Sequence, residues 1–81
     1  MEKRTFIFII ETEAHLTILA RILHMFTRSR IAIDELHANM PRDIQRFTIT
    51  VSDTKESARK LFSKIGGQVD VISVNLFEQI N

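Results

Sequence analysis

Two successive runs of strand, helix and strand within 81 residues limit the folds open to this chain more than any other feature of the sequence. The expected elements are strands at residues 6–11, 33–40, 47–51 and 69–76, and helices from residue 16 to about Ser29 and at 53–65. A β-α-β-β-α-β order this compact predicts a four-stranded antiparallel sheet with both helices on one face. We expect a single α+β domain that spans residues 1–81.

This order is the ferredoxin-like plan, and its first strand is apolar on both faces. Phe6, Phe8 and Ile10 point to one side, and Ile7 and Ile9 point to the other. A strand buried on one side alternates polar with apolar residues, so this strand is expected to be central, with its second face covered. The cover is expected to be either the chain's own termini or a second copy.

Helical periodicity is clear in both expected helices. The first has an apolar stripe of Leu19, Ile22, Leu23 and Phe26, flanked by Ile18 and Met25. The second has an apolar stripe of Ala58, Leu61, Phe62 and Ile65. Its start is predicted at Asp53 as N-cap, with Glu56 completing an acidic capping box, and its end at the two glycines 66 and 67.

Two strands lose their alternation, and one connection has turn chemistry. The alternation of apolar and polar residues changes phase near Glu35 and again near Val71, which predicts a bulge or a shifted strand end at each place. Pro41, Arg42 and Asp43 are predicted to form the hairpin turn between the second and third strands.

Composition excludes several classes of protein. The chain has no cysteine, which removes disulfides, thiolate metal sites and cysteine nucleophiles. Its longest apolar run is far shorter than the ~20 residues of a membrane span, and no signal peptide precedes the first strand, so we expect a cytoplasmic location. The formal net charge of +1 argues against a strong phosphate-binding surface.

Other occupations of the ferredoxin-like fold are disfavoured one by one. A copper chaperone requires two thiolates, and an acylphosphatase requires an arginine in the first strand-to-helix loop, where Glu13 stands instead. RNA recognition requires exposed aromatics on the central strands. Phe47 alternates with core residues, so we interpret it as a core side chain.

Candidate metal-binding and catalytic residues do not form a site. His15, His24 and His37 fall on a loop, a helix and a strand, and their spacing gives no metal-ligand pair. Two carboxylate pairs, Asp34 with Glu35 and Glu11 with Glu13, have no acid–base partner and are expected to be solvated strand ends. We therefore expect a binding or regulatory protein that is not an enzyme and holds neither cofactor nor metal.

A family resemblance covers residues 6–77. The stretches that carry it are LARILHMFTRSRIAI at 19–33, RFTITV at 46–51, LFSKI at 61–65 and VDVISV at 69–74. They resemble ACT domains, in particular the short regulatory small subunit of acetolactate synthase (acetohydroxyacid synthase) of the isozyme II type. The resemblance implies a homodimer joined through sheet edges and a partner, the thiamine-diphosphate-dependent large subunit, which the small subunit activates in branched-chain amino-acid biosynthesis.

The resemblance also implies an effector site, and this chain departs from the family pattern there. Such a site lies between the first loop of one copy and the start of the second strand of the other. The residues that correspond to it or to the interface are Glu13, Ala14, His15, Thr17, Ile31, Ala32 and Ile33.

The family's usual Asn and Gly of the loop are Ala14 and Thr17 here, and its usual Gly and Asn before the second strand are Arg30 and Ala32. A missing amide cannot bond an amino-acid ligand, and a Cβ closes the approach that glycine leaves open. We expect a weak or absent response to valine or another branched-chain effector. The alternative function is a free-standing ACT module that senses an amino acid for another enzyme.

Overall fold

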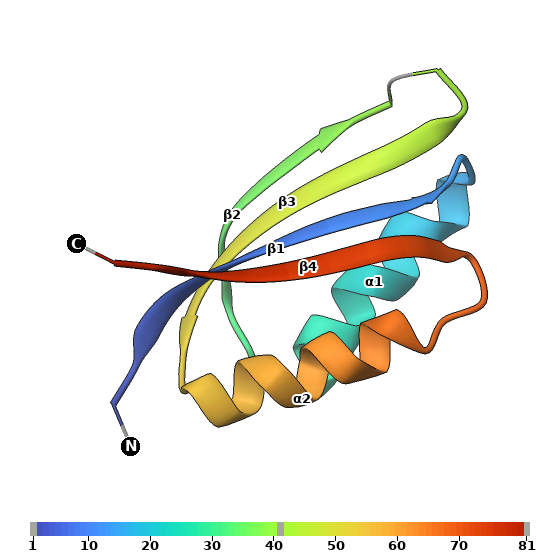
Figure 1. Ribbon diagram of the computed structural model, residues 1–81. Coiled ribbons are helices and arrows are strands. Elements are labelled where there is room, and N and C mark those ends of the chain that lie inside the picture. The colour runs from blue at the N-terminus through green and yellow to red at the C-terminus, as the bar shows by residue number, and fades with distance from the viewer. Residues whose placement is uncertain (1, 41, 81) are drawn as a thin grey trace.

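The computed structural model describes residues 2–40 and 42–80, and Figure 1 shows its six elements in the expected order. These are β1 (Arg4–Glu13), α1 (Leu16–Arg28), β2 (Ile33–Asn39), β3 (Ile44–Asp53), α2 (Lys55–Gly66) and β4 (Val71–Gln79). Every strand but β2 runs past at least one predicted end. The hairpin between β2 and β3 contains Arg42 and Asp43, and Pro41 lies outside the described residues.

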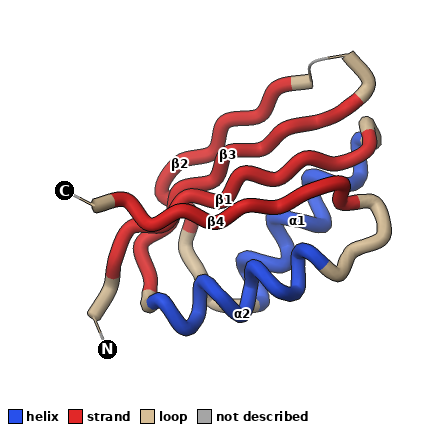
Figure 2. Tube along the Cα trace, viewed as in Figure 1, coloured by secondary structure: helices blue, strands red, loops and turns tan. Residues whose placement is uncertain are grey.

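The four strands form one antiparallel sheet in the order β2-β3-β1-β4. Phe8 of β1 pairs with Ile49 of β3 on one side and with Leu76 of β4 on the other, which makes β1 central as predicted. Both helices lie on the same face of the sheet (Figure 2). The predicted ferredoxin-like α+β fold is confirmed.

The core lies between the sheet and the two helices, and alternation in the strands decides which side chains enter it. Phe6, Phe8 and Ile10 of β1 and Phe47, Ile49 and Val51 of β3 are all at most 2% exposed. The helices complete this core with Ile18, Ile22, Phe26, Ala58, Leu61 and Ile65. In α1 the stripe is rotated from the prediction, because Ile18, Ile22 and Phe26 form its buried centre while Leu19 and Met25 only pack against it.

At both positions where the alternation changes phase, the pairing between neighbouring strands is irregular. On β2, Ile33 pairs with Val51 and Glu35 with Thr50, so Asp34 is the extra residue of a bulge. On β4, Ser73 pairs with Glu11 and Val71 with Thr12, so Ile72 is bulged and 57% exposed.

The caps of α2 differ from the prediction. Its N-cap is Thr54, whose hydroxyl accepts a hydrogen bond from the Ser57 N–H (3.2 Å), while the Asp53 carboxylate accepts one from the Thr54 N–H (2.8 Å). Two adjacent cap-forming residues were available, and the helix starts at the second. Glu56 is therefore not part of a capping box and pairs instead with Lys60. Gly67 ends the helix with φ −83°, so no left-handed glycine is used.

The helix-free face of the sheet is not covered by any segment of the described chain. Ile7 and Ile9 remain half-buried there, and Phe77, which pairs with Ile7, is 51% exposed. In Figure 2 the first and last strands continue past one end of the sheet and do not fold back over this face. Of the two covers expected for β1, the chain's own termini are therefore excluded for residues 2–40 and 42–80.

Candidate functional site

The loop between β1 and α1 is held against the loop that precedes β4. The Glu13 N–H donates to the carbonyl of Asp70 (3.1 Å), and the Arg21 guanidinium donates to the Asp70 carboxylate. The hydrogen bond from Arg21 holds the pKa of Asp70 below its ordinary value, so the ion pair is formed at neutral pH. His15 is the N-cap residue of α1, although its side chain makes no capping hydrogen bond.

The connection from α1 to β2 is a tight turn through Arg30. The Arg30 N–H donates to the Thr27 carbonyl (3.0 Å) and the Ile31 N–H to the Phe26 carbonyl (3.0 Å), which is the Schellman pattern of helix termination. Arg30 has φ +60°, in the left-handed region that favours glycine. Ile31 closes the motif as a core residue that is 3% exposed.

The edge strand β2 is exposed to solvent along nearly all of its length, and we call it the bare edge below. Six of its seven residues are exposed and Ile33 is half-buried. Leu36 and Ala38 pair with the inward-facing Ile49 and Phe47, so they share the helix side of the sheet, yet Leu36 is 37% exposed. A hollow of about 170 Å³ lies between this edge and α1, lined by Leu19, Ala38, Asn39, Met40, Gln45 and Phe47. An exposed edge strand that is paired on one side only has free backbone groups with which another strand can pair.

The residues proposed for an effector or interface site fall into two groups within one chain. Glu13, Ala14, His15 and Thr17 are exposed around the start of α1. Ala32 is exposed and Ile33 is half-buried at the start of β2, beyond the other end of α1. The 13 residues of α1 span about 20 Å, and Figure 1 shows the two groups at opposite ends of the helix. A single copy does not bring them together.

A polar cluster occupies one end of the helix-free sheet face. Arg46 donates to Glu11 through both Nε (2.9 Å) and Nη2 (2.7 Å), and the Ser73 hydroxyl donates to the other carboxylate oxygen (3.1 Å). Glu11 is therefore an ion-pair partner rather than a free strand-end carboxylate. The hydrogen bonds from Arg46 and then Ser73 lower its pKa.

This cluster predicts a pH dependence of stability. Glu11 is more acidic when folded, so its contribution is complete above its ordinary pKa of 4.5 and is lost as pH falls through the lower folded value. Below about pH 5, we expect the urea concentration at the unfolding midpoint to decrease as the pH decreases. This decrease is expected to be less steep in Glu11→Gln. Glu2→Gln removes an equal charge from an exposed residue and serves as control. An unchanged slope in Glu11→Gln would contradict the role of this ion pair.

Three other features considered from the sequence are RNA-binding aromatic residues, metal-binding groups and membrane-spanning helices. Phe47 is 1% exposed and Phe6 and Phe8 lie in the core, so the core interpretation of Phe47 is confirmed and no RNA-type aromatic pair faces out from β1 and β3. Residues 2–40 and 42–80 contain no group of three or more His, Asp or Glu positioned to hold a metal ion. No helix among them is long and apolar enough to cross a membrane.

Two features of these surfaces were missed in the sequence. The solvent exposure of β2 depends on where α1 packs on the sheet, and no local sequence pattern specifies that position. The placement of Arg21, Met25 and Arg28 along one side of α1 did have a signal, because residues four and seven apart share a helix face.

Comparison with known proteins identifies structures that share the fold of this chain. No family model and no curated protein matches the sequence. Among solved structures, the ACT domain of the GTP pyrophosphokinase of Chlorobium tepidum is similar at 13% identity, with a TM-score of 0.81 over 93% of this chain and 99% of that chain. An uncharacterised protein of Thermotoga maritima matches at 17% identity and a TM-score of 0.81, covering 98% of this chain and 100% of the other.

The same fold also occurs as a small part of a longer protein. A homoserine dehydrogenase of Thiobacillus denitrificans is 16% identical with a TM-score of 0.78, over 94% of this chain and 17% of that chain. These identities are low, so the likeness concerns the fold alone. That fold is the ACT type of the ferredoxin-like plan.

Proposed function

We propose that this chain is a single, non-catalytic regulatory ACT domain that forms a homodimer through its β2 edges and acts as the small subunit of acetolactate synthase. The observation that carries the dimer is the exposed edge strand β2, in which Leu36 is 37% exposed, followed directly by Met40, which is 52% exposed. A domain of this size buries only about 60% of its unfolded surface, so pairing adds stability that the monomer lacks.

The geometry of such a dimer supports a shared effector site. β2 starts beside the end of α1 and finishes near the loop between β1 and α1 (Figure 1). If two copies of β2 pair antiparallel around a two-fold axis, the start of β2 in one copy lies near the first loop of the other. Ala32 and Ile33 of one protomer would then face Ala14 and Thr17 of its partner.

The partner is proposed from sequence. The segments at 61–65 and 69–74 resemble small subunits of acetolactate synthase, and in the fold they form the end of α2 and the turn into β4 with its first residues. The chain would activate the catalytic subunit by binding its active state more tightly than its inactive state, since equal affinity for both shifts no equilibrium. The catalytic residues and the thiamine diphosphate would belong to the large subunit.

The effector response is proposed to be weak. Ala14, Thr17 and Ala32 offer no side-chain amide to an amino-acid carboxylate or ammonium group. Arg30 keeps the left-handed backbone that a glycine would adopt, so the path of the turn is retained while its side chain adds bulk. Loss of ligand contacts rather than loss of the fold is the proposed cause.

The dimer is tested by placing a charge on the bare edge. Leu36→Glu is expected to raise the dimer dissociation constant at least about tenfold, because a carboxylate would be buried without a partner. Sedimentation equilibrium over a dilution series measures this constant. Ile72→Glu is the matched control, since Ile72 is an exposed apolar residue on the opposite edge strand, β4. A wild-type protein that stays monomeric, or equal dissociation in both variants, would refute pairing through β2.

The partner is tested by measuring acetolactate formation. The large subunit from the same source is assayed with and without this chain, and then with valine, isoleucine and leucine. Stimulation without inhibition is expected. Inhibition by an amino acid would show that the altered loop still binds an effector, and no stimulation would reject the small-subunit assignment. The alternative, a free-standing amino-acid sensor, predicts instead that the isolated chain binds an amino acid in calorimetry.

A further inference from the structure

Charge is strongly segregated between the two layers of the fold. α1 and α2 together contain six Arg and Lys residues and one carboxylate, a net charge of +5. The whole chain carries +1, so the strands and loops carry −4. The near-neutral total therefore conceals a basic helix layer. Such a layer attracts anions to its surface.

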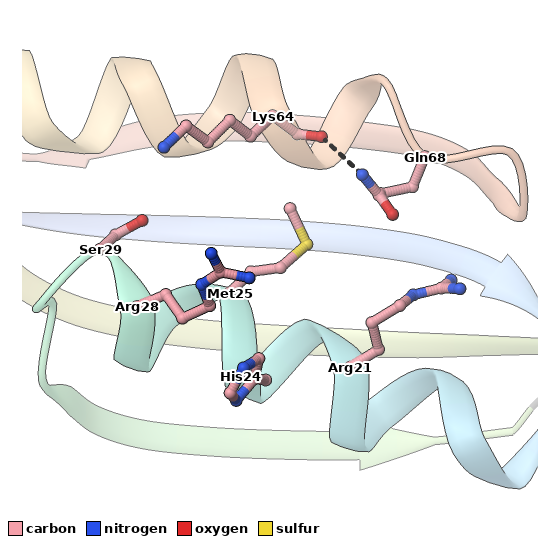
Figure 3. Close-up of a pocket in the computed structure, with 7 residues that line it drawn as sticks. All are labelled: Arg21, His24, Met25, Arg28, Ser29, Lys64 and Gln68. Atoms are coloured by element: carbon pink, nitrogen blue, oxygen red, sulfur yellow. Dashed lines mark hydrogen bonds between the residues drawn. The ribbon is translucent and has the colours of Figure 1, made fainter.

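A groove of about 480 Å³ runs between the two helices within this basic layer. Arg21, Met25 and Arg28 line it from α1, and Lys64 and Gln68 line it from α2 and the turn that follows. Figure 3 shows Met25 and Arg28 extending from α1 toward α2. Met25 is half-buried and gives the groove an apolar element between cationic side chains. This volume lies within the range of sites that bind small molecules, about 300–1,000 Å³.

Two of the three cations are free to bind an added anion. Arg21 pairs with Asp70. For Arg28 and Lys64, no carboxylate of the described residues lies within ion-pair distance. Like charges converging on one groove repel one another, and a bound anion removes that repulsion.

The negative ends of the two helix dipoles do not fully neutralise these cations. Arg28 and Lys64 stand in the last turns of their helices, where the dipole places about half a negative charge. The terminal carbonyls are, however, already hydrogen-bonded. The Met25 carbonyl accepts from the Ser29 N–H, and the Lys64 carbonyl accepts from the Gly67 N–H and from Gln68 Nε2. Two full positive charges therefore exceed what the dipoles neutralise.

We propose that this groove binds a phosphorylated small molecule, with the phosphoryl oxygens between Arg28 and Lys64 and the apolar part of the ligand against Met25. Guanidinium and ammonium groups are the side chains that bind phosphate, and arginine does so with paired N–H donors. A compact groove with one apolar element fits a small molecule better than a nucleic-acid backbone, which requires a longer track of cations. This site is distinct from the proposed effector site at the β2 edge.

The experiment is calorimetric titration of the intact chain with inorganic pyrophosphate, adenosine diphosphate and adenosine. Both phosphorylated probes are expected to bind and adenosine is not, with adenosine diphosphate tighter because its ring contacts Met25. The double variant Arg28→Gln/Lys64→Gln is expected to weaken binding by at least about tenfold. Lys55→Gln/Arg59→Gln removes the same two charges from α2 outside the groove and is expected to keep the wild-type dissociation constant.

Three results would overturn the proposal. They are no binding of either phosphorylated probe, equal losses in the two double variants, and binding of adenosine as tight as that of its diphosphate. Amide shifts in the wild-type protein give a test that does not depend on folding of the variants. With pyrophosphate, the changes are expected at residues 24–29 and 64–68, and changes centred elsewhere would reject this groove.

Discussion

Replacing Phe26 with alanine is expected to remove about 3–5 kcal/mol of folding free energy, out of the roughly 4–12 kcal/mol typical of a domain this small. Phe26 is 1% exposed and meets Phe8 of the central strand edge-to-face, with ring centroids 5.1 Å apart and planes at 79°. This pair joins α1 to the middle of the sheet. Its loss leaves a cavity that the surrounding strands cannot fill by moving, because β1 is hydrogen-bonded on both sides.

Urea unfolding followed by circular dichroism measures this loss. Phe77→Ala deletes the same side chain from the helix-free sheet face, where Phe77 is 51% exposed, and is expected to cost less than about 1 kcal/mol. If Phe26→Ala proves too unstable to study, Phe26→Leu provides a smaller step with the same sign. Equal costs at Phe26 and Phe77 would show that the packing of α1 on the sheet does not dominate stability.

The opposite sign is expected at Arg30. Arg30→Gly should stabilise the fold by roughly 1–2 kcal/mol, because the residue has φ +60° and a Cβ in the left-handed region costs about that much. For a domain of this length the melting temperature should rise by about 4–8 °C per kcal/mol. The Schellman hydrogen bonds of Arg30 and Ile31 are made by the backbone and remain in the variant.

Arg30→Ala separates the backbone effect from the loss of the charged side chain. Alanine removes the guanidinium but keeps the Cβ, so no comparable gain in melting temperature is expected. A gain in Arg30→Ala as large as that in Arg30→Gly would mean that the charge, not the left-handed backbone, was unfavourable. Scanning calorimetry of both variants decides between these causes.

The fold could be predicted from the sequence because its signals are local and periodic. Alternation placed Phe47, Ile49 and Val51 in the core, and the loss of alternation located the bulges at Asp34 and Ile72. The errors were also local. Asp53 and Thr54, which precede α2, can both cap a helix, and the structure uses Thr54. In α1 the buried Ile22 and Phe26 were predicted correctly, but Ile18 was predicted as a flank and is buried.

The candidate site was less predictable because it depends on relations between segments. The bareness of β2 arises from the position of α1 under the sheet, and the basic groove arises from two helices whose charges lie far apart in sequence. The total charge of +1 argued against an anion site, although the structure separates +5 on the helices from −4 elsewhere. Composition alone contains no information on that separation. The effector residues remain a prediction, since one copy holds them at opposite ends of α1.

The pairing of the first strand with the last has a consequence for how this domain can be connected to other polypeptide. Thr5 of β1 pairs with Gln79 of β4, so the chain enters and leaves the sheet on neighbouring strands, at the end of the sheet on the left of Figure 1. β3 and β1 separate the last strand, β4, from β2, and β3 separates the first strand, β1, from β2, so neither end of the chain lies on the exposed edge strand. The fold can therefore be spliced into a longer protein, or joined in tandem, without obstructing the strand that is free to pair.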